Sequence, residues 1–234
     1  MFAEIARVAL TPSYIDTAVL SGATYCYRVR AFNAVAFSDY SNVACSATAA
    51  SGGTFSDDFN RPDATALGNG WTSVAGSLAI QAHQARSAKA RTMNTAVQAG
   101  LSGASETVSA SFASLDNNLG PRFSLLVRYQ DPENYYACYR QTGGSSTIRI
   151  ARVVQGVETV LKMAAVSNPP IGQLFSLGCQ VQGTAITLTY GSTRLTAVDA
   201  VLATGSVGMS LGYPVTGTGS AASHIADNFK ATVQ

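Results

Sequence analysis

Apolar and polar residues alternate in short runs along much of the chain, and the clearest run covers residues 25–31. One face of that run carries Tyr25, Tyr27, Val29 and Ala31, and the other carries Cys26, Arg28 and Arg30. A period of two is typical of a β-strand with one buried face. A second strand is predicted over 40–48, and the turn-prone stretch 33–39 lets it fold back antiparallel.

The chain from Phe55 onward is a series of short β-favouring runs separated by Gly, Asn, Asp and Pro. These runs are 55–59, 77–82, 106–113, 122–129, 134–141, 147–154, 174–181, 185–190, 206–213 and 227–233. Short strands at this spacing predict an all-β protein with an antiparallel β-sandwich or jelly roll. The segment DPEN, 131–134, predicts a hairpin loop. The Ala-rich stretch 84–100 would suit a helix by composition, but we expect irregular or strand structure there.

The small residues AASGGT, 49–54, have no anchoring side chain and predict a linker. It divides the chain into a short first part, 1–48, and a complete domain, 55–234. Since neither part contains an uninterrupted apolar stretch of about 18 residues, no membrane span is expected. Glu4 and Arg7 interrupt the apolar start, so we expect any signal peptide to lie outside this chain.

Charged residues make up 12% of the chain, and the formal net charge is +2. The densest basic group, Arg86, Lys89 and Arg91, is too sparse to follow a phosphate backbone, so nucleic acid is not an expected partner.

Four cysteines are present, and none has the C-x-x-C spacing of zinc or redox motifs. Cys26 and Cys45 fall on neighbouring predicted strands, where a cross-strand bridge is feasible. We expect that pair and the pair Cys138 and Cys179 to form two disulfides, with buried free thiols as the alternative. Disulfides imply an oxidising compartment, and hence a secreted protein.

The first part resembles the second half of a fibronectin type III domain. The matching residues are Leu20, Gly22, Thr24, Tyr25, Tyr27, Val29, Ala31, Asn33, Ser38 and Ser41. The resemblance implies that Tyr25 has a structural role, with its hydroxyl closing a turn between two strands. A complete sandwich of this class has about 100 residues, so the first half is missing and an exposed apolar face is expected.

The larger part resembles the concanavalin A-like lectin and glucanase jelly rolls, of the LamG-like kind that bacteria attach to secreted polysaccharide-active enzymes and surface proteins. The matching strings are 55–72, 122–140, 206–212 and 226–233. The resemblance implies a structural calcium between the first and last strands. Asp227 and then Asp58 are the candidate ligands, since Ca²⁺ prefers oxygen donors. Alternatively, these aspartates and Asp57 cap turns or pair with Arg61 and Lys230.

No catalytic residue is predicted. Glucanases of this fold carry Glu-x-Asp-x-x-Glu on one strand, and this chain lacks that string; its glutamates Glu4, Glu106, Glu133 and Glu158 are isolated. Ser210 lies within a Gly-x-Ser-x-Gly sequence, but that motif acts as a nucleophile elbow only at a strand-to-helix turn. A strand of an all-β domain is not that setting, and His83 and His224 are expected on the surface.

Sugar binding needs aromatic faces that stack on pyranose rings and planar polar groups that pair with hydroxyls. The hairpin 128–140 offers both, and Trp71 is a further stacking candidate, although packing is its commoner role. The candidate ligand-binding residues are Arg128, Tyr129, Tyr135, Tyr136, Tyr139, Arg140 and Trp71.

The leading hypothesis is therefore a non-catalytic carbohydrate-binding or adhesion module of a secreted multidomain protein. Its expected partners are a polysaccharide or other glycan and upstream domains of the same polypeptide. Two alternatives stay open: a glycoside hydrolase of the same fold, and a structural spacer in a surface or phage-like assembly.

Overall fold

The computed structural model describes residues 2–8, 13–16, 18–19, 24–48, 51–90, 92–116, 120–143, 145–213 and 224–234. Within these ranges the regular structure is entirely β, and all the strand pairs are antiparallel. The predicted fold class is thus confirmed, and no helix long and apolar enough to cross a membrane occurs in the described ranges.

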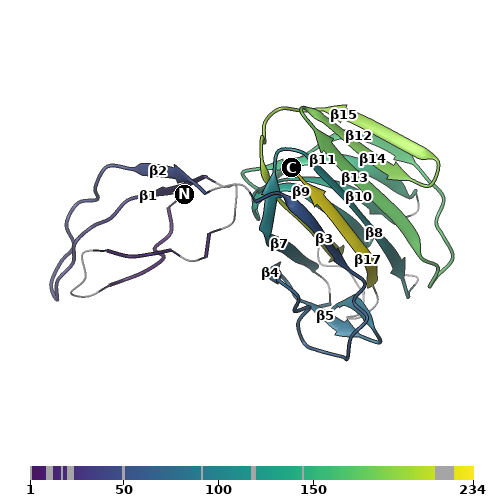
Figure 1. Cartoon of the computed structure of the whole chain (residues 1–234), viewed down its shortest axis with the longest axis horizontal. Coiled ribbons are helices and arrows are strands. Elements are labelled where there is room, and N and C mark those ends of the chain that lie inside the picture. Colours follow the sequence, from purple (N-terminus) through teal and green to yellow (C-terminus); the bar gives the residue numbers. More distant parts are fainter. Residues whose placement is uncertain are drawn as a thin grey trace.

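Two sheets form the sandwich (Figure 1). In spatial order, the first sheet contains β12 (Val157–Ala165), β11 (Thr147–Val154), β10 (Asn134–Gln141), β9 (Arg122–Asp131), β16 (Gly205–Gly212), β7 (Met93–Gly103) and β4 (Trp71–Ala75). The second contains β15 (Thr193–Val198), β14 (Ala185–Tyr190), β13 (Phe175–Gln182), β8 (Glu106–Ser114), β17 (His224–Val233), β6 (Gln84–Ser87) and β5 (Leu78–Gln81). β3 (Gly53–Asp57) pairs with β17 and so brings the start and the end of the domain together.

The core lies between the two sheets and follows from the alternation in the sequence. Phe175, Leu177, Cys179 and Val181 of β13 are buried, whereas Ser176 and Gln180 between them are exposed. Facing strands contribute in the same way, and the ring of Phe123 lies 5.3 Å from that of Phe175. Burial of apolar area on this scale is the main stabilising term of such a domain.

Both predicted disulfides are present. Cys138 of β10 and Cys179 of β13 join the two sheets across the core, with their Cα atoms 5.7 Å apart. Cys26 and Cys45 are direct cross-strand partners in a separate pair of strands.

The predicted strands of the larger part are present, and 84–100 falls in β6 and β7 as extended structure. The hairpin at 131–134 is also confirmed, since β9 ends at Asp131 and β10 begins at Asn134. The sequence reading missed β4, β12 and β15. β12 is an edge strand with mostly exposed side chains, so it lacks the alternation that marks a half-buried strand.

The predicted linker is shorter in the structure. β3 begins at Gly53, opposite Val233, and Ser51 forms a bridge with Ser102 of β7. Residues 49 and 50 lie outside the described residues, as do Leu20, Gly22 and Arg91.

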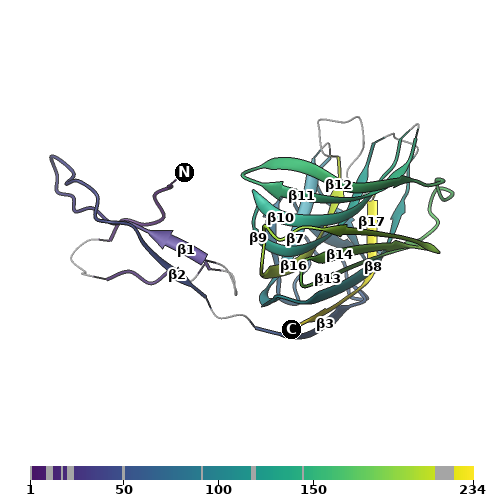
Figure 2. The same ribbon diagram turned by 90° about the horizontal axis from the view of Figure 1, so that it is seen from above.

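The first part contains one hairpin, formed by β1 (Thr24–Tyr27) and β2 (Ala44–Ala47), which we call the N-terminal hairpin (Figure 2). β1 is shorter than the predicted strand because two serine hydroxyls replace backbone carbonyls as acceptors beyond Tyr27, although the Ser41 and Ser38 amides still donate to the Val29 and Ala31 carbonyls. Ser41 Oγ accepts a hydrogen bond from the Val29 amide, and Ser38 Oγ accepts one from the Ala31 amide. On the face expected to be exposed, Val29 is 71% exposed, whereas Tyr25 and Tyr27 are half-buried.

Candidate functional site

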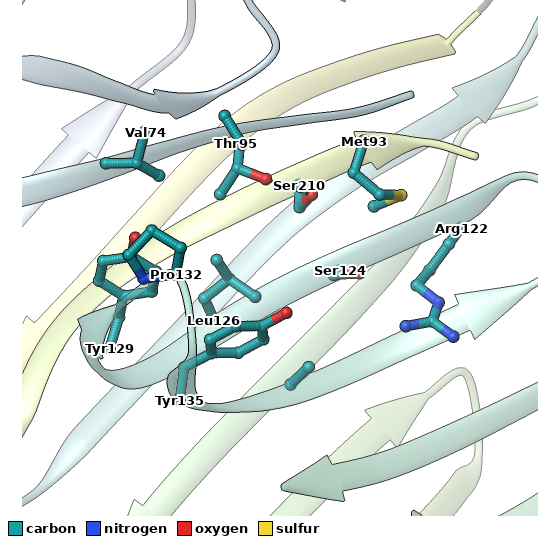
Figure 3. A pocket seen from close by; sticks show the side chains of 12 residues that line it. Val74, Met93, Thr95, Arg122, Ser124, Leu126, Tyr129, Pro132, Tyr135 and Ser210 are labelled. Carbon is teal, nitrogen blue, oxygen red and sulfur yellow. Dashed lines mark hydrogen bonds between the residues drawn. The ribbon is translucent and has the colours of Figure 1, made fainter. Parts of the chain in front are cut away.

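A cleft of about 140 Å³ lies on the outer face of the first sheet, opposite the core. It is lined by side chains from β4, β7, β16, β9 and β10 and from the hairpin loop after β9 (Figure 3). Its lining residues are Val74, Ala75, Met93, Thr95, Arg122, Ser124, Leu126, Tyr129, Pro132, Tyr135, Ala137 and Ser210.

A row of hydroxyl groups crosses the cleft at right angles to the strands. Ser210 of β16 lies directly between Thr95 of β7 and Ser124 of β9 in the sheet register. The hydroxyls of Thr95 and Ser210 are 2.7 Å apart and hydrogen-bonded to each other. Each hydroxyl can donate one hydrogen bond and accept others, and the row lies deep in the cleft, with Ser124 only 2% and Ser210 only 4% exposed.

The next row of the sheet forms a floor of small and apolar residues. Gly208, Leu126 and Ala137 are neighbours on β16, β9 and β10. A Cβ on Gly208 would lie 2.6 Å from the Ala96 carbonyl oxygen, so a larger residue does not fit at this position. Of these three residues, Leu126 and Ala137 line the cleft, whereas glycine at 208 is required by the close approach of β7 to β16.

Two stacked tyrosines stand at one end of the cleft, beside Pro132 (Figure 3). The rings of Tyr129 and Tyr135 are 5.8 Å apart at an angle of 28°. Tyr129 is buried and Tyr135 is half-buried, and burial raises the pKa of both hydroxyls. Both hydroxyls are thus neutral at physiological pH, and no hydrogen-bond partner of the Tyr129 hydroxyl occurs among the described residues.

Arg122 stands at the other end and is held in place by two neighbours. Its Nη1 donates to Glu158 Oε2 at 2.5 Å, and its guanidinium lies 3.9 Å from the centre of the Tyr139 ring. Burial acts to raise the pKa of Glu158, but the hydrogen bonds and charge of Arg122 hold it below its ordinary value. Glu158 therefore stays ionised and neutralises Arg122.

Of the predicted ligand-binding residues, Tyr129 and Tyr135 reach the cleft. Tyr139 lies on the same face but is fully buried beneath Arg122, and its hydroxyl donates to Glu158 Oε1 at 2.8 Å. Burial raises the pKa of Tyr139 to about 12. Tyr139 thus positions the Arg122–Glu158 pair rather than facing a ligand.

The structure corrects the prediction for Arg128, because a bulge in β9 changes the alternation there. Tyr129 pairs with Ser206 whereas Leu126 pairs with Gly208, so one extra residue is accommodated and Arg128 takes a φ of 47°. Its guanidinium donates to the carbonyl oxygens of Leu202, Ala104 and Gly183. Arg128 ties three loops together and does not face the cleft.

The prediction that Tyr136 and Arg140 bind a ligand is also corrected. Their side chains point between the sheets, on the face opposite Tyr135 and Tyr139. Both are fully buried; the Tyr136 hydroxyl donates to Asp199 at 2.5 Å, and Arg140 Nη2 donates to Asn168 at 2.6 Å.

Trp71 packs on the core instead of forming a sugar platform. Its ring lies 4.8 Å from that of Phe229, and its Nε1 donates to Asp57 Oδ2 at 2.9 Å. The same carboxylate pairs with Arg61 at 2.7 Å, which is one of the alternatives that the sequence left open for the aspartates.

The calcium site remains a prediction. The Asp58 carboxylate accepts the Asn60 amide, and the Asp227 carboxylate accepts the Asn228 amide. No group of three or more His, Cys, Asp or Glu side chains suited to a metal occurs in the described part of the chain.

The Gly-x-Ser-x-Gly sequence lies within β16, in the interior of the sheet, and Ser210 faces the cleft. His224 belongs to the other sheet and is buried against Phe123 and Tyr213, with Nδ1 3.4 Å from the Ser87 hydroxyl. The expectation of a surface position for His224 was therefore wrong. His83 is exposed at a turn.

Sequence reasoning missed Arg122, Ser124 and Thr95 as site residues, and it treated Ser210 only as a possible nucleophile. Only the sheet register reveals these residues as parts of one site, because the three hydroxyls align only when β7, β16 and β9 are neighbours. β7 and β9 are separated from β16 by many strands in the sequence, so a reading of single segments cannot align them.

No family model and no curated protein matches this sequence. Solved structures with the same fold do match. A carbohydrate binding module, CBM66 from Bacillus subtilis, has a TM-score of 0.59 at 16% identity, over 70% of this chain and 95% of that one. A β-glucanase from Bacillus licheniformis has a TM-score of 0.57 at 13% identity, over 78% and 99%.

The CBM2 module of the evolved Dit protein of Lactobacillus casei BL23 phage J-1 has a TM-score of 0.56 at 11% identity, over 76% and 94%. At these identities the likeness shows the fold alone. The larger part of this chain is thus a jelly-roll β-sandwich of the kind found in carbohydrate-binding modules and in glycoside hydrolases.

Proposed function

We propose that the sandwich is a non-catalytic carbohydrate-binding module of a secreted protein and that its ligand lies in the cleft. The observation that carries this proposal is the composition of the cleft: a tyrosine pair, the apolar residues Leu126 and Ala137, and a hydroxyl row, with no carboxylate among its lining residues. Small-molecule sites typically combine such apolar surfaces with a few fixed polar groups.

Each part of the cleft suits one feature of a sugar. The accessible face of Tyr135 can stack on pyranose C–H groups. Ser124 and Ser210 can exchange hydrogen bonds with sugar hydroxyls. Because Glu158 neutralises Arg122, the cleft carries no excess charge, which favours an uncharged glycan.

A hydrolase is the second candidate, because Glu158 lies next to the cleft-lining Arg122. Glycoside hydrolysis uses two carboxyl groups about 5 to 9.5 Å apart, one of them an acid with a raised pKa. The pKa of Glu158 is lowered instead, and the lining offers it no acidic partner. We therefore expect that the protein releases no reducing ends from polysaccharides. If it does release them and Glu158→Gln abolishes this activity, the protein is a hydrolase instead.

The binding test uses Tyr135→Ala in the full chain and a panel of insoluble polysaccharides. We expect binding to fall about tenfold, since a stacking contact with an aromatic ring contributes about 0.5–1.5 kcal/mol and about 1.4 kcal/mol corresponds to a factor of ten. Tyr14→Ala is the matched control, because Tyr14 is 51% exposed and lies outside the cleft. If the Tyr135→Ala protein binds as well as the parent protein, the ligand does not bind in the cleft.

Two further expectations belong to the same proposal. Secretion is supported by the two disulfides, and fibronectin-type spacers upstream would link this module to other domains and raise its avidity. If a calcium ion binds at Asp58 and Asp227, the Tm should be higher with calcium in the buffer than with a chelator. An equal Tm in the two buffers would rule out the calcium site.

A further inference from the structure

The N-terminal hairpin carries a ladder of alternating arginine and aromatic side chains. The Arg28 guanidinium carbon lies 3.9 Å from the centre of the Tyr40 ring and 4.5 Å from that of Phe2. The Arg30 guanidinium carbon lies 4.8 Å from the Tyr40 ring centre and 3.9 Å from that of Phe37. Tyr40 is thus held between two cations. We call Arg28, Tyr40, Arg30 and Phe37 the arginine ladder.

The backbone under the arginine ladder is tied down at several points. The Cys26–Cys45 disulfide joins the two strands next to it. Beyond the disulfide, Ser41 and Ser38 accept the Val29 and Ala31 amides. The ladder is therefore fixed before any partner arrives, which lowers the entropy lost on binding.

The guanidinium groups keep most of their hydrogen-bonding capacity. A guanidinium that stacks through its face leaves its N–H edge free for a carboxylate, in a planar fork that matches two oxygens. Arg28 is exposed and makes no ion pair with the described residues. Arg30 has one carboxylate nearby, Glu4 at 3.5 Å, and Glu4 is engaged more closely by Arg7 at 2.7 Å.

The arginine ladder faces away from the exposed apolar surface of the hairpin. Arg28 and Arg30 alternate with Val29 along the chain, so their side chains project to the opposite side. A domain half that covers Val29 would therefore leave the arginines open to another partner.

We infer that the arginine ladder is a second binding surface, independent of the cleft, which pairs with the carboxylates of an acidic polysaccharide. The forks of Arg28 and Arg30 suit the carboxylates of successive uronic acid units, and Tyr40 and Phe37, 44% and 47% exposed, leave apolar surface for contact with the sugar rings. A nucleic acid fits less well, because proteins that follow its backbone make about 6–10 phosphate contacts. The choice of a polysaccharide over other acidic polymers rests on the proposed function of the sandwich.

The experiment measures binding of the full chain to polygalacturonate, a soluble uronic acid polymer, at low and high salt. We expect Arg28→Gln with Arg30→Gln to weaken binding at least tenfold at low salt. The matched control is Arg194→Gln with Lys162→Gln, which removes the same charge from exposed positions on the sandwich and leaves the affinity within about twofold. Arg28→Lys with Arg30→Lys keeps the charge but loses the fork, so an intermediate loss supports the stacked geometry.

Several results would overturn the inference. One is parent-like polygalacturonate binding by the Arg28→Gln, Arg30→Gln protein, and another is an equal loss in the control protein. If duplex DNA or anionic vesicles bind the parent protein as tightly as polygalacturonate does, the partner of the arginine ladder is not specifically a polysaccharide. Tyr135→Ala separates the two proposals: it should weaken only uncharged glycans, and loss of polygalacturonate binding would place that polymer in the cleft.

Discussion

The sandwich and the N-terminal hairpin carry similar patterns and one disulfide each, yet they are stabilised in different ways. In β13 the apolar half of the pattern is buried, with Leu177 only 1% exposed. In the hairpin the corresponding face is only partly covered, with Val29 71% exposed and Tyr25 and Tyr27 half-buried. A pattern of period two therefore predicts a strand with one apolar face, but whether that face is covered depends on a partner sheet.

Aromatic residues show the same difference. In the sandwich, rings pack on rings in the core, as Phe112, Phe123 and Phe175 do. In the hairpin, rings pack on guanidinium groups at the surface as well as on each other, as Phe32 and Phe37 do. Cation–π contacts at exposed sites contribute about 0.5–1 kcal/mol each, whereas a buried aromatic side chain is worth several times more.

The largest contrast is expected from deletion of an aromatic ring in each region. Phe123→Ala leaves a cavity between the sheets and should lower the free energy of unfolding of the sandwich by about 3–5 kcal/mol. Phe37→Ala in the hairpin should leave that transition unchanged. Chemical denaturation followed by the fluorescence of Trp71 measures both. An equal effect of the two changes would show that the regions unfold as one unit.

Removal of each disulfide should also affect the stability of the two regions differently. Cys138→Ala with Cys179→Ala opens a loop with a sequence separation of 41, and should destabilise the sandwich by about 2–4 kcal/mol through unfolded-chain entropy. Cys26→Ala with Cys45→Ala should leave the Tm of the sandwich unchanged and make the hairpin a faster target for limited proteolysis. Unaltered cleavage within 24–48 would contradict the role given to this disulfide.

A pH effect of smaller size is expected in the sandwich alone. Burial raises the pKa of Glu106 well above its ordinary value, although the Arg128 amide donates to Glu106 Oε2 at 2.7 Å. The folded state then binds a proton that the unfolded state has lost, so stability falls as pH rises above the ordinary pKa of about 4.5 toward the folded pKa. Glu106→Gln should remove this fall.

Thermal unfolding at pH 4 and pH 7 tests that expectation. The Glu106→Gln protein should gain on the order of 1 kcal/mol relative to the parent at pH 7 and nothing at pH 4. Glu133→Gln, in the exposed loop, is the control and should follow the parent. A gain of the same size at both pH values would assign the effect to packing.

The smallest effect is expected on the exposed face of the hairpin. Val29→Ser should change the stability of the isolated chain by less than about 0.5 kcal/mol, because a surface side chain loses little buried area. Equilibrium denaturation with the parent as reference checks this. A cost of more than about 1 kcal/mol would mean that another part of the chain covers Val29 in solution.

Prediction from the sequence succeeded where local pattern decides the structure. The turn residues Asp131 and Pro132 marked a hairpin correctly, and the pairing of Cys26 with Cys45 followed from two adjacent strands. It failed where a single extra residue changes the alternation, as at Arg128, and where a strand shows no alternation, as in β12. Of the candidate site, Tyr129 and Tyr135 were found, but Arg122 and the hydroxyl row were not.

The sequence by itself determined that this chain forms antiparallel strands, where most of them lie and that Cys26 can meet Cys45, because these properties depend on periodicity and turn chemistry within short segments. Only the tertiary structure decided which tyrosines face the cleft, that Arg140 and Tyr136 belong to the core, and that Thr95, Ser210 and Ser124 form one row. The physical reason is that a sheet joins strands that are distant in sequence, and the face on which a side chain lies depends on the register of every neighbour.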